Sequence, residues 1–222
     1  MSIDREERPS DSRFVRSVTR IAYNEHRADL SVPDGCWDVV VFRNRSGATV
    51  LLTGTTTRPV TSINRPGDEL LCISFKPGGY MPRFAPVRMR DRAITLPNPN
   101  RYSLRLGSEV LEIPTFENAD DFVAKLSKAG LLAHDSLVDS VISGDPRAAS
   151  IRSLQRHFLI ATGLTLSFHR QIERARRAVE LLREGRAAVE VALEAGYADQ
   201  SHMINSLKAI TGQTPSQIVK NR

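Results

Sequence analysis

Apolar and polar positions follow two different periods along the chain, and the change falls near residue 115. Before it, short β-branched runs alternate with turn residues, and the clearest runs cover residues 38–42, 48–53 and 70–75. Proline and glycine recur between these runs too often for helices. Several short strands at this spacing predict a β-sandwich or barrel over residues 14–115. The residues before 14 are polar, and we expect them to be mobile.

The segment from residue 118 to residue 222 carries the period of helices. Phe122, Val123 and Leu126 share one face of an expected helix over residues 121–132. Ser150 and Asp199 suit helix starts, because their side-chain oxygens accept hydrogen bonds from free backbone N–H groups. Further helices are expected at about residues 137–142, 150–162, 165–184, 189–195 and 199–212. The predicted fold class is therefore α+β, with a β-rich half followed by an all-α domain.

Two parts of the helical half repeat one pattern. Each has a capping residue, then a helix with polar side chains, then a Thr-Gly-x-Thr stretch. These stretches are Thr162-Gly-Leu-Thr165 and Thr211-Gly-Gln-Thr214. A helix-turn-helix needs a small residue inside its first helix and a glycine in the turn, and Ala192 and Gly196 meet that need. The repeat predicts helix-turn-helix units at about 135–163 and 187–212, joined by a linker helix at about 165–184.

Polar side chains on the second helix of each unit are the candidate DNA contacts. Arginine suits a forked contact to guanine, glutamine suits adenine, and shorter polar groups reach base edges or phosphates. The alternative is a solvated helix face, and the repetition of the pattern favours DNA binding over it. The candidates are Arg152, Gln155 and Arg156 in the first unit, and Gln200, Ser201, His202, Asn205 and Lys208 in the second.

Composition changes this interpretation little. Lys and Arg outnumber Asp and Glu by 31 to 25, and the net charge of +6 favours anionic partners without identifying one. Cys36 and Cys72 stand among apolar neighbours, so we expect buried free thiols in a reducing compartment. The charged N-terminus and the lack of a long apolar run predict a cytoplasmic protein without a membrane partner.

Residues 150–218 resemble the C-terminal domain of the AraC/XylS family of transcription regulators. The resemblance is carried by the residues around Leu154 to Phe158, by the Gly196-Tyr-Ala-Asp-Gln-Ser201 stretch and by the final Gly212-Gln-Thr-Pro215. It implies sequence-specific duplex binding by two recognition helices. Two departures stand out: Asn205 replaces a longer polar side chain, and residues 144–149 are longer than the usual tight turn.

The N-terminal half resembles, more loosely, the cupin-like sensor domains that precede such readers. Candidate ligand-binding residues there are Trp37, Asp38, Phe75, Lys76 and Tyr80, although aromatic residues of a β-domain are more often core. A cupin enzyme needs clustered His and carboxylate ligands, and only His26 precedes Pro114. We therefore expect no catalysis, no metal and no cofactor.

Together these features predict a one-component transcription regulator, an activator or a repressor, that binds double-stranded DNA. A small-molecule effector, a homodimeric state and contact with the transcription machinery stay open as partners. Two other classes also stay open. One is a cupin-like small-molecule binding protein or enzyme with a helical appendage, and the other is a helical protein-interaction adaptor that does not touch DNA.

Overall fold

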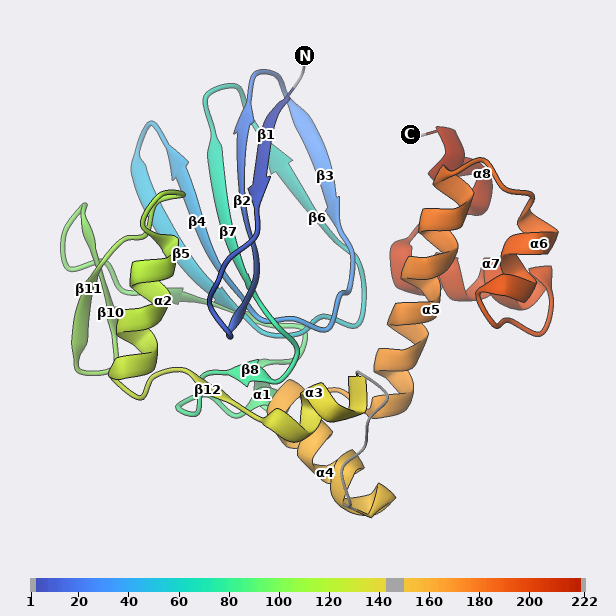
Figure 1. Ribbon diagram of the computed structural model, residues 1–222. Helices are drawn as coiled ribbons and strands as arrows, with labels where there is room; N and C mark the ends of the chain where they lie inside the picture. Colours follow the sequence, from blue (N-terminus) through green and yellow to red (C-terminus); the bar gives the residue numbers. More distant parts are fainter. Residues whose placement is uncertain (1–2, 143–149, 221–222) are drawn as a thin grey trace.

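The computed structural model describes residues 3–142 and 150–220, in a β-rich N-terminal half and a helical C-terminal half (Figure 1). This α+β architecture confirms the predicted fold class. The six-stranded antiparallel sheet has the strand order β1-β2-β7-β4-β5-β9. Its strands are β1 (Ile3–Arg8), β2 (Val15–Tyr23), β4 (Asp38–Asn44), β5 (Gly47–Thr53), β7 (Glu69–Phe75) and β9 (Ala93–Leu96).

Three two-stranded ribbons complete the β-rich half. They are β3 (Arg27–Ser31) with β6 (Val60–Asn64), β10 (Ser103–Leu106) with β11 (Glu109–Glu112), and β8 (Gly79–Tyr80) with β12 (Ala133–His134). The three strands predicted most clearly, at 38–42, 48–53 and 70–75, are confirmed as β4, β5 and β7.

The expectation that the residues before 14 are mobile is wrong for β1. Its six residues pair in full register with β2, from Ile3 opposite Tyr23 to Arg8 opposite Val18. The strand is charged because it is an edge strand, and charged side chains discourage further pairing at an open edge. Such a sequence lacks the apolar alternation by which strands are predicted.

The core of the β-rich half lies on one face of the large sheet. Alternate residues of the central strands, such as Val39, Val41 and Ile73, are fully buried there. The helix α2 (Ala119–Lys128) covers this face together with β10, because Phe122, Val123 and Leu126 pack into the same core. We therefore propose that the helical domain begins after α2 and not at residue 118.

The remaining helices belong to a second core. They are α3 (Ser136–Ile142), α4 (Ile151–Thr162), α5 (Leu166–Arg183), α6 (Ala188–Glu194), α7 (Gln200–Thr211) and α8 (Pro215–Lys220), and α1 (Pro86–Met89) is a short helix of the β-rich half. The second core includes Phe158 of α4, Ile172 of α5 and Leu207 of α7. The long turn expected over residues 144–149 lies outside the described residues.

Candidate nucleic-acid interface

The unit formed by α6 and α7 has a tight turn fixed by backbone hydrogen bonds. Gly196 adopts a left-handed conformation (φ +79°), and the next N–H, of Tyr197, donates to Ala192 O at 2.8 Å. Ala192 is buried, so its small side chain lets the two helices approach. Asp199 then caps α7, because its Oδ1 accepts from His202 N at 2.7 Å. The predicted turn and cap are confirmed.

Arg174 of α5 holds this turn against the linker helix. Its Nη1 donates to Gly196 O at 3.3 Å, and its guanidinium lies 5.3 Å from the ring centre of Tyr197. The Tyr197 hydroxyl in turn lies 3.2 Å from Ser206 Oγ in α7. The orientation of α7 is therefore set by packing and by polar contacts from two sides.

The first unit positions α4 in the same way at its start. Ser150 Oγ accepts from Ser153 N at 3.2 Å, which confirms the predicted cap. Near the middle of the helix, His157 Nδ1 lies 2.8 Å from Asp135 Oδ2, just before α3. Leu154 and Phe158 face the core, so the opposite side of α4 is left to solvent.

The ends of α4 and α7 share one hydrogen-bond pattern. The last threonine of each helix, Thr162 or Thr211, donates through Oγ1 to the carbonyl four residues earlier, at 2.7 Å in both helices. The same Oγ1 accepts from the N–H two residues later, at 3.1 Å and 3.2 Å. Gly163 and Gly212 follow in left-handed conformations, at φ +77° and +69°. The repeat seen in the sequence is therefore a repeat in structure, over two helices of 12 residues each.

All eight predicted DNA contacts lie on α4 or α7 and are exposed. Those of α7 stand opposite Met203 and Leu207, which are fully buried behind them. None of the eight side chains takes part in an ion pair or a side-chain hydrogen bond within residues 3–142 and 150–220. The exposed residues are Arg152, Gln155, Arg156, Gln200, Ser201, His202, Asn205 and Lys208.

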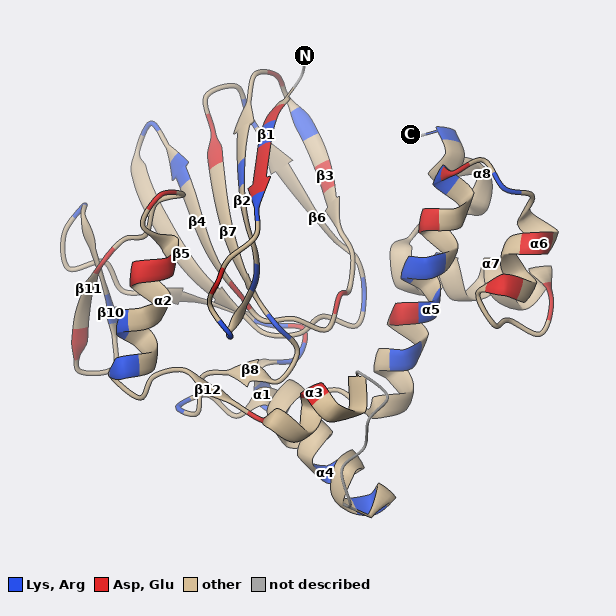
Figure 2. Cartoon of the chain, in the orientation of Figure 1, with Lys and Arg blue, Asp and Glu red and all other residues tan. Residues whose placement is uncertain are grey.

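The linker helix adds one cation to the α4 side that the sequence did not single out. A groove of about 540 Å³ lies between α4 and α5, and both Gln155 and Arg170 line it. Arg170 is exposed and forms no ion pair within the described residues. Other arginines of α5 differ: Arg176 pairs with Glu173 at 2.8 Å, and Arg177 pairs with Glu194 at 2.9 Å. Figure 2 shows the resulting alternation of positive and negative bands along α5.

The C-terminal end of α4 is docked directly on the β-rich half. Thr55 Oγ1 donates to Thr162 O at 2.8 Å, and both residues are buried. A Cβ on Gly163 would lie 2.5 Å from Pro86 O, so the two backbones are in contact at this point. The first helix-turn-helix unit is therefore anchored to the β-rich half, a contact that sequence periodicity could not predict.

A buried histidine lies at the same contact between the β-rich half and the helical half. His169, near the start of α5, packs against the Phe158 ring at 5.1 Å between ring centres, and a Cβ on Gly35 would lie 2.8 Å from its Nδ1. Neither ring nitrogen has a hydrogen-bond partner within the described residues. Burial lowers the pKa of His169, so the ring is neutral where the two halves meet.

The five ligand-binding residues predicted in the β-rich half do not gather around a cavity. Trp37 and Phe75 are buried in the core of the sheet, and Tyr80 packs against both cores. Asp38 is held by Thr53, whose Oγ1 donates to Asp38 Oδ2 at 3.2 Å, and Lys76 is partly exposed. None of the five lines the groove between α4 and α5 or the cavity of about 320 Å³ beside Arg43. Their role in ligand binding stays a prediction.

Asp38 is expected to make stability depend on pH. Burial, followed by the nearby Asp34 carboxylate, raises the pKa of Asp38 to about 6. The unfolded chain has an aspartate pKa of about 3.9, so the folded state holds a proton that the unfolded state releases between these values. The free energy of unfolding should therefore fall as the pH rises from about 4 to about 6, by about 3 kcal/mol at most.

The variant Asp38→Asn should remove this dependence and be more stable than the unchanged protein at neutral pH. Urea unfolding between pH 4 and pH 7 measures it, with Asp121→Asn at an exposed position as the matched control. An unchanged pH profile in Asp38→Asn would contradict the assignment.

No helix among the described residues is both long enough and apolar enough to cross a membrane. No group of three or more His, Cys, Asp or Glu side chains within residues 3–142 and 150–220 is placed to hold a metal ion. Cys36 and Cys72 are free thiols, as predicted, and Cys36 is the more deeply buried of the two.

Comparison with solved structures gives matches to ToxT from Vibrio cholerae. Its structure at 1.65 Å resolution has a TM-score of 0.44 and 9% identity, covering 99% of this chain and 98% of that chain. ToxT bound to (E)-4-(8-methylnaphthalen-1-yl)but-3-enoic acid has a TM-score of 0.44 and 10% identity, covering 99% of each chain. ToxT bound to an unsaturated fatty acid has a TM-score of 0.38 and 10% identity, covering 98% of this chain and 94% of that chain. No curated protein matches the chain.

A protein-family model described as a helix-turn-helix domain matches residues 148–221. This range holds α4 to α8, the two recurring helix ends and all eight exposed candidate contacts. The resemblance to the AraC/XylS family is confirmed over this part of the chain. Residues 148–221 match a helix-turn-helix domain of the AraC type.

Proposed function

We propose that the chain regulates transcription by placing α4 and α7 in successive major grooves of one duplex. The observation that supports this is the repetition of α4 and α7, with the same pattern of capping hydrogen bonds and the same exposed polar side, before and after α5 in the chain. Eighteen residues of α5 span about 27 Å at 1.5 Å per residue. One turn of DNA is about 34 Å, so the linker helix has a length suited to neighbouring grooves.

In this proposal different side chains supply specificity and affinity. Arg152, Gln155 and Arg156 read base edges from α4, while Ser201, His202 and Asn205 do so from α7. Gln200, Lys208 and Arg170 contact phosphates, which hold the protein in register.

The proposed regulation follows from the docking of α4. Because Thr162 and Gly163 contact the β-rich half directly, a change in that half alters the position of the first recognition helix. A small molecule that binds one arrangement of the two halves better than another would then change DNA affinity. A homodimeric state and contact with the transcription machinery stay predictions.

The salt dependence of duplex binding tests the proposal. Two cations without an ion pair in the described residues, Arg170 and Lys208, are placed on phosphates, which predicts a slope of log K against log salt of about −2. Arg170→Ala should make the slope shallower by about 1. Arg176→Ala, which removes a cation already paired with Glu173, is the matched control and should change it less.

Fluorescence anisotropy of the full chain with a labelled duplex at several salt concentrations gives both slopes. Absence of duplex binding, or binding that does not respond to salt, would refute DNA binding and favour the adaptor function.

A further inference from the structure

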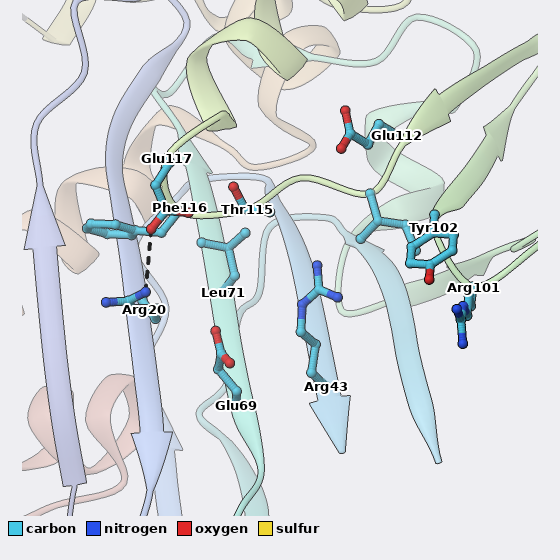
Figure 3. A pocket seen from close by; sticks show the side chains of 11 residues that line it. Arg20, Arg43, Glu69, Leu71, Arg101, Tyr102, Glu112, Thr115, Phe116 and Glu117 are labelled. Carbon is cyan, nitrogen blue, oxygen red and sulfur yellow. Dashed lines mark ion pairs between the residues drawn. The ribbon is translucent and has the colours of Figure 1, made fainter. Parts of the chain in front are cut away.

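A cavity of about 320 Å³ lies at the edge of the β-rich half, remote from α4 and α7 (Figures 1 and 3). It opens between the core face of the large sheet, at β2, β4 and β7, and the segment that runs from Arg101 to Glu117. Its volume is at the small end of the range for ligand sites. None of the residues proposed to contact DNA lines it.

Arg43 is the central polar group of this cavity. It stands near the end of β4, two residues after the buried Val41, so its side chain leaves the core face and enters the cavity (Figure 3). Its Nη2 donates to Pro114 O at 3.3 Å, and the residue is partly buried. It forms no ion pair within the described residues, so its remaining N–H donors are available.

The neighbouring Arg20 lines the same cavity but, unlike Arg43, is held by ion pairs. Its guanidinium pairs with Glu6 at 2.7 Å and with Glu117 at 3.5 Å, and it lies 5.1 Å from the ring centre of Phe116 (Figure 3). Arg20 therefore closes one side of the cavity. Arg43 has no such partners, although Glu69 is its direct neighbour on β7.

Part of the wall around Arg43 is apolar. Leu71 and Ile113 are 3% exposed and form the inner wall, while the Tyr102 ring, 64% exposed, stands at the mouth. A guanidinium between such walls binds a carboxylate more strongly than in water, through two parallel hydrogen bonds. An apolar or aromatic body attached to that carboxylate would cover Leu71 and the Tyr102 ring.

Two carboxylates limit the charge of the ligand. Glu69 and Glu112 line the same cavity, and neither forms an ion pair within the described residues. Glu117 also lines the cavity but is paired with Arg20, and Arg101 lines it near Tyr102. Arg43 and Arg101 together offset the charges of Glu69 and Glu112, so negative charge beyond the one bound by Arg43 is repelled by these carboxylates and a ligand with one negative charge is favoured over a phosphate or a dicarboxylate.

We propose that this cavity binds a small organic monocarboxylate, with the carboxylate on Arg43 and the apolar body between Leu71 and Tyr102. The ligand would be the effector of the regulator, and that part of the inference rests on the proposed function. Binding to the cavity does not depend on DNA, so the two can be tested separately.

Calorimetric titration of the full chain with phenylacetate, without DNA, tests the site. Millimolar or tighter binding is expected, together with at least about tenfold weaker binding of the neutral phenylacetamide and of the doubly charged phenyl phosphate. Arg43→Gln should weaken phenylacetate binding by about tenfold or more. Arg45→Gln, on the exposed turn after β4, is the matched control and should leave binding unchanged.

Tyr102→Ala supplies a second variant that keeps the fold, because the side chain is mostly exposed. It should weaken phenylacetate binding while thermal unfolding stays as in the unchanged chain. No binding of phenylacetate at millimolar concentration, or equal binding by Arg43→Gln, overturns the proposal. Binding that leaves DNA affinity unchanged supports the site and overturns only its role as the effector site.

Discussion

Replacing Gly163 by valine is expected to lower the melting temperature by about 6–12 °C, which corresponds to a loss of about 3 kcal/mol in a chain of this size. Two costs add at this position. Gly163 has φ +77°, a conformation in which a β-branched side chain is strained. Its Cβ would also lie 2.5 Å from Pro86 O and 2.8 Å from Pro86 C, and backbone atoms cannot move aside as a flexible side chain can.

Gly67→Val separates the two costs. Gly67 has φ +87°, but no atom lies within 4 Å of an added Cβ, so only the conformational cost of about 1–2 kcal/mol applies. Thermal unfolding of both variants measures the difference. Equal losses of melting temperature would mean that the contact between α4 and Pro86 adds nothing.

The same substitution should also affect DNA binding. Relief of the clash requires α4 to move away from α1, and α4 carries Arg152, Gln155 and Arg156. Gly163→Val should therefore weaken duplex binding even at temperatures where the protein stays folded, whereas Gly67→Val should not. This comparison connects the packing of the two halves to the proposed regulation.

The helical half could be predicted closely because its signals are local. Ser150 and Asp199 cap helices through bonds that span three residues, and Gly163, Gly196 and Gly212 end helices or form turns through their own conformation. Apolar residues at helical spacing then identify the buried face. Each of these signals is contained in a short stretch of sequence.

The features that the sequence did not predict depend on residues far apart in the chain. Thr55 meets Thr162 only because α4 packs beside α1, and Arg43 acquires its cavity from the segment that ends at Glu117. Trp37 and Phe75 are aromatic residues of the β-rich half, and residue type alone does not tell whether such a side chain lies in the core or lines a ligand site. The strand β1 could not be predicted because its charged edge-strand sequence lacks alternating apolar residues.

Gln155→Ala is expected to relax the choice of base in one half of the DNA site by about 1–3 kcal/mol and to leave the other half unchanged. Gln155 is exposed on α4 and can form two hydrogen bonds to adenine, and alanine forms neither. Asn205 occupies the corresponding exposed side of α7, so Asn205→Ala should relax the other half instead. Both side chains are exposed and form no side-chain hydrogen bond within the described residues, so the fold should be unaffected.

The most direct measurement is selection of duplexes from a random pool by the full chain, at near-physiological salt, beside these two variants. The full chain is needed because α4 is docked on the β-rich half through Thr162 and Gly163. The account predicts a motif with two patches about 10–10.5 base pairs apart, of which each variant relaxes one. A pool without a motif, or a single patch that responds to only one of the variants, would contradict the reading of two successive grooves by α4 and α7.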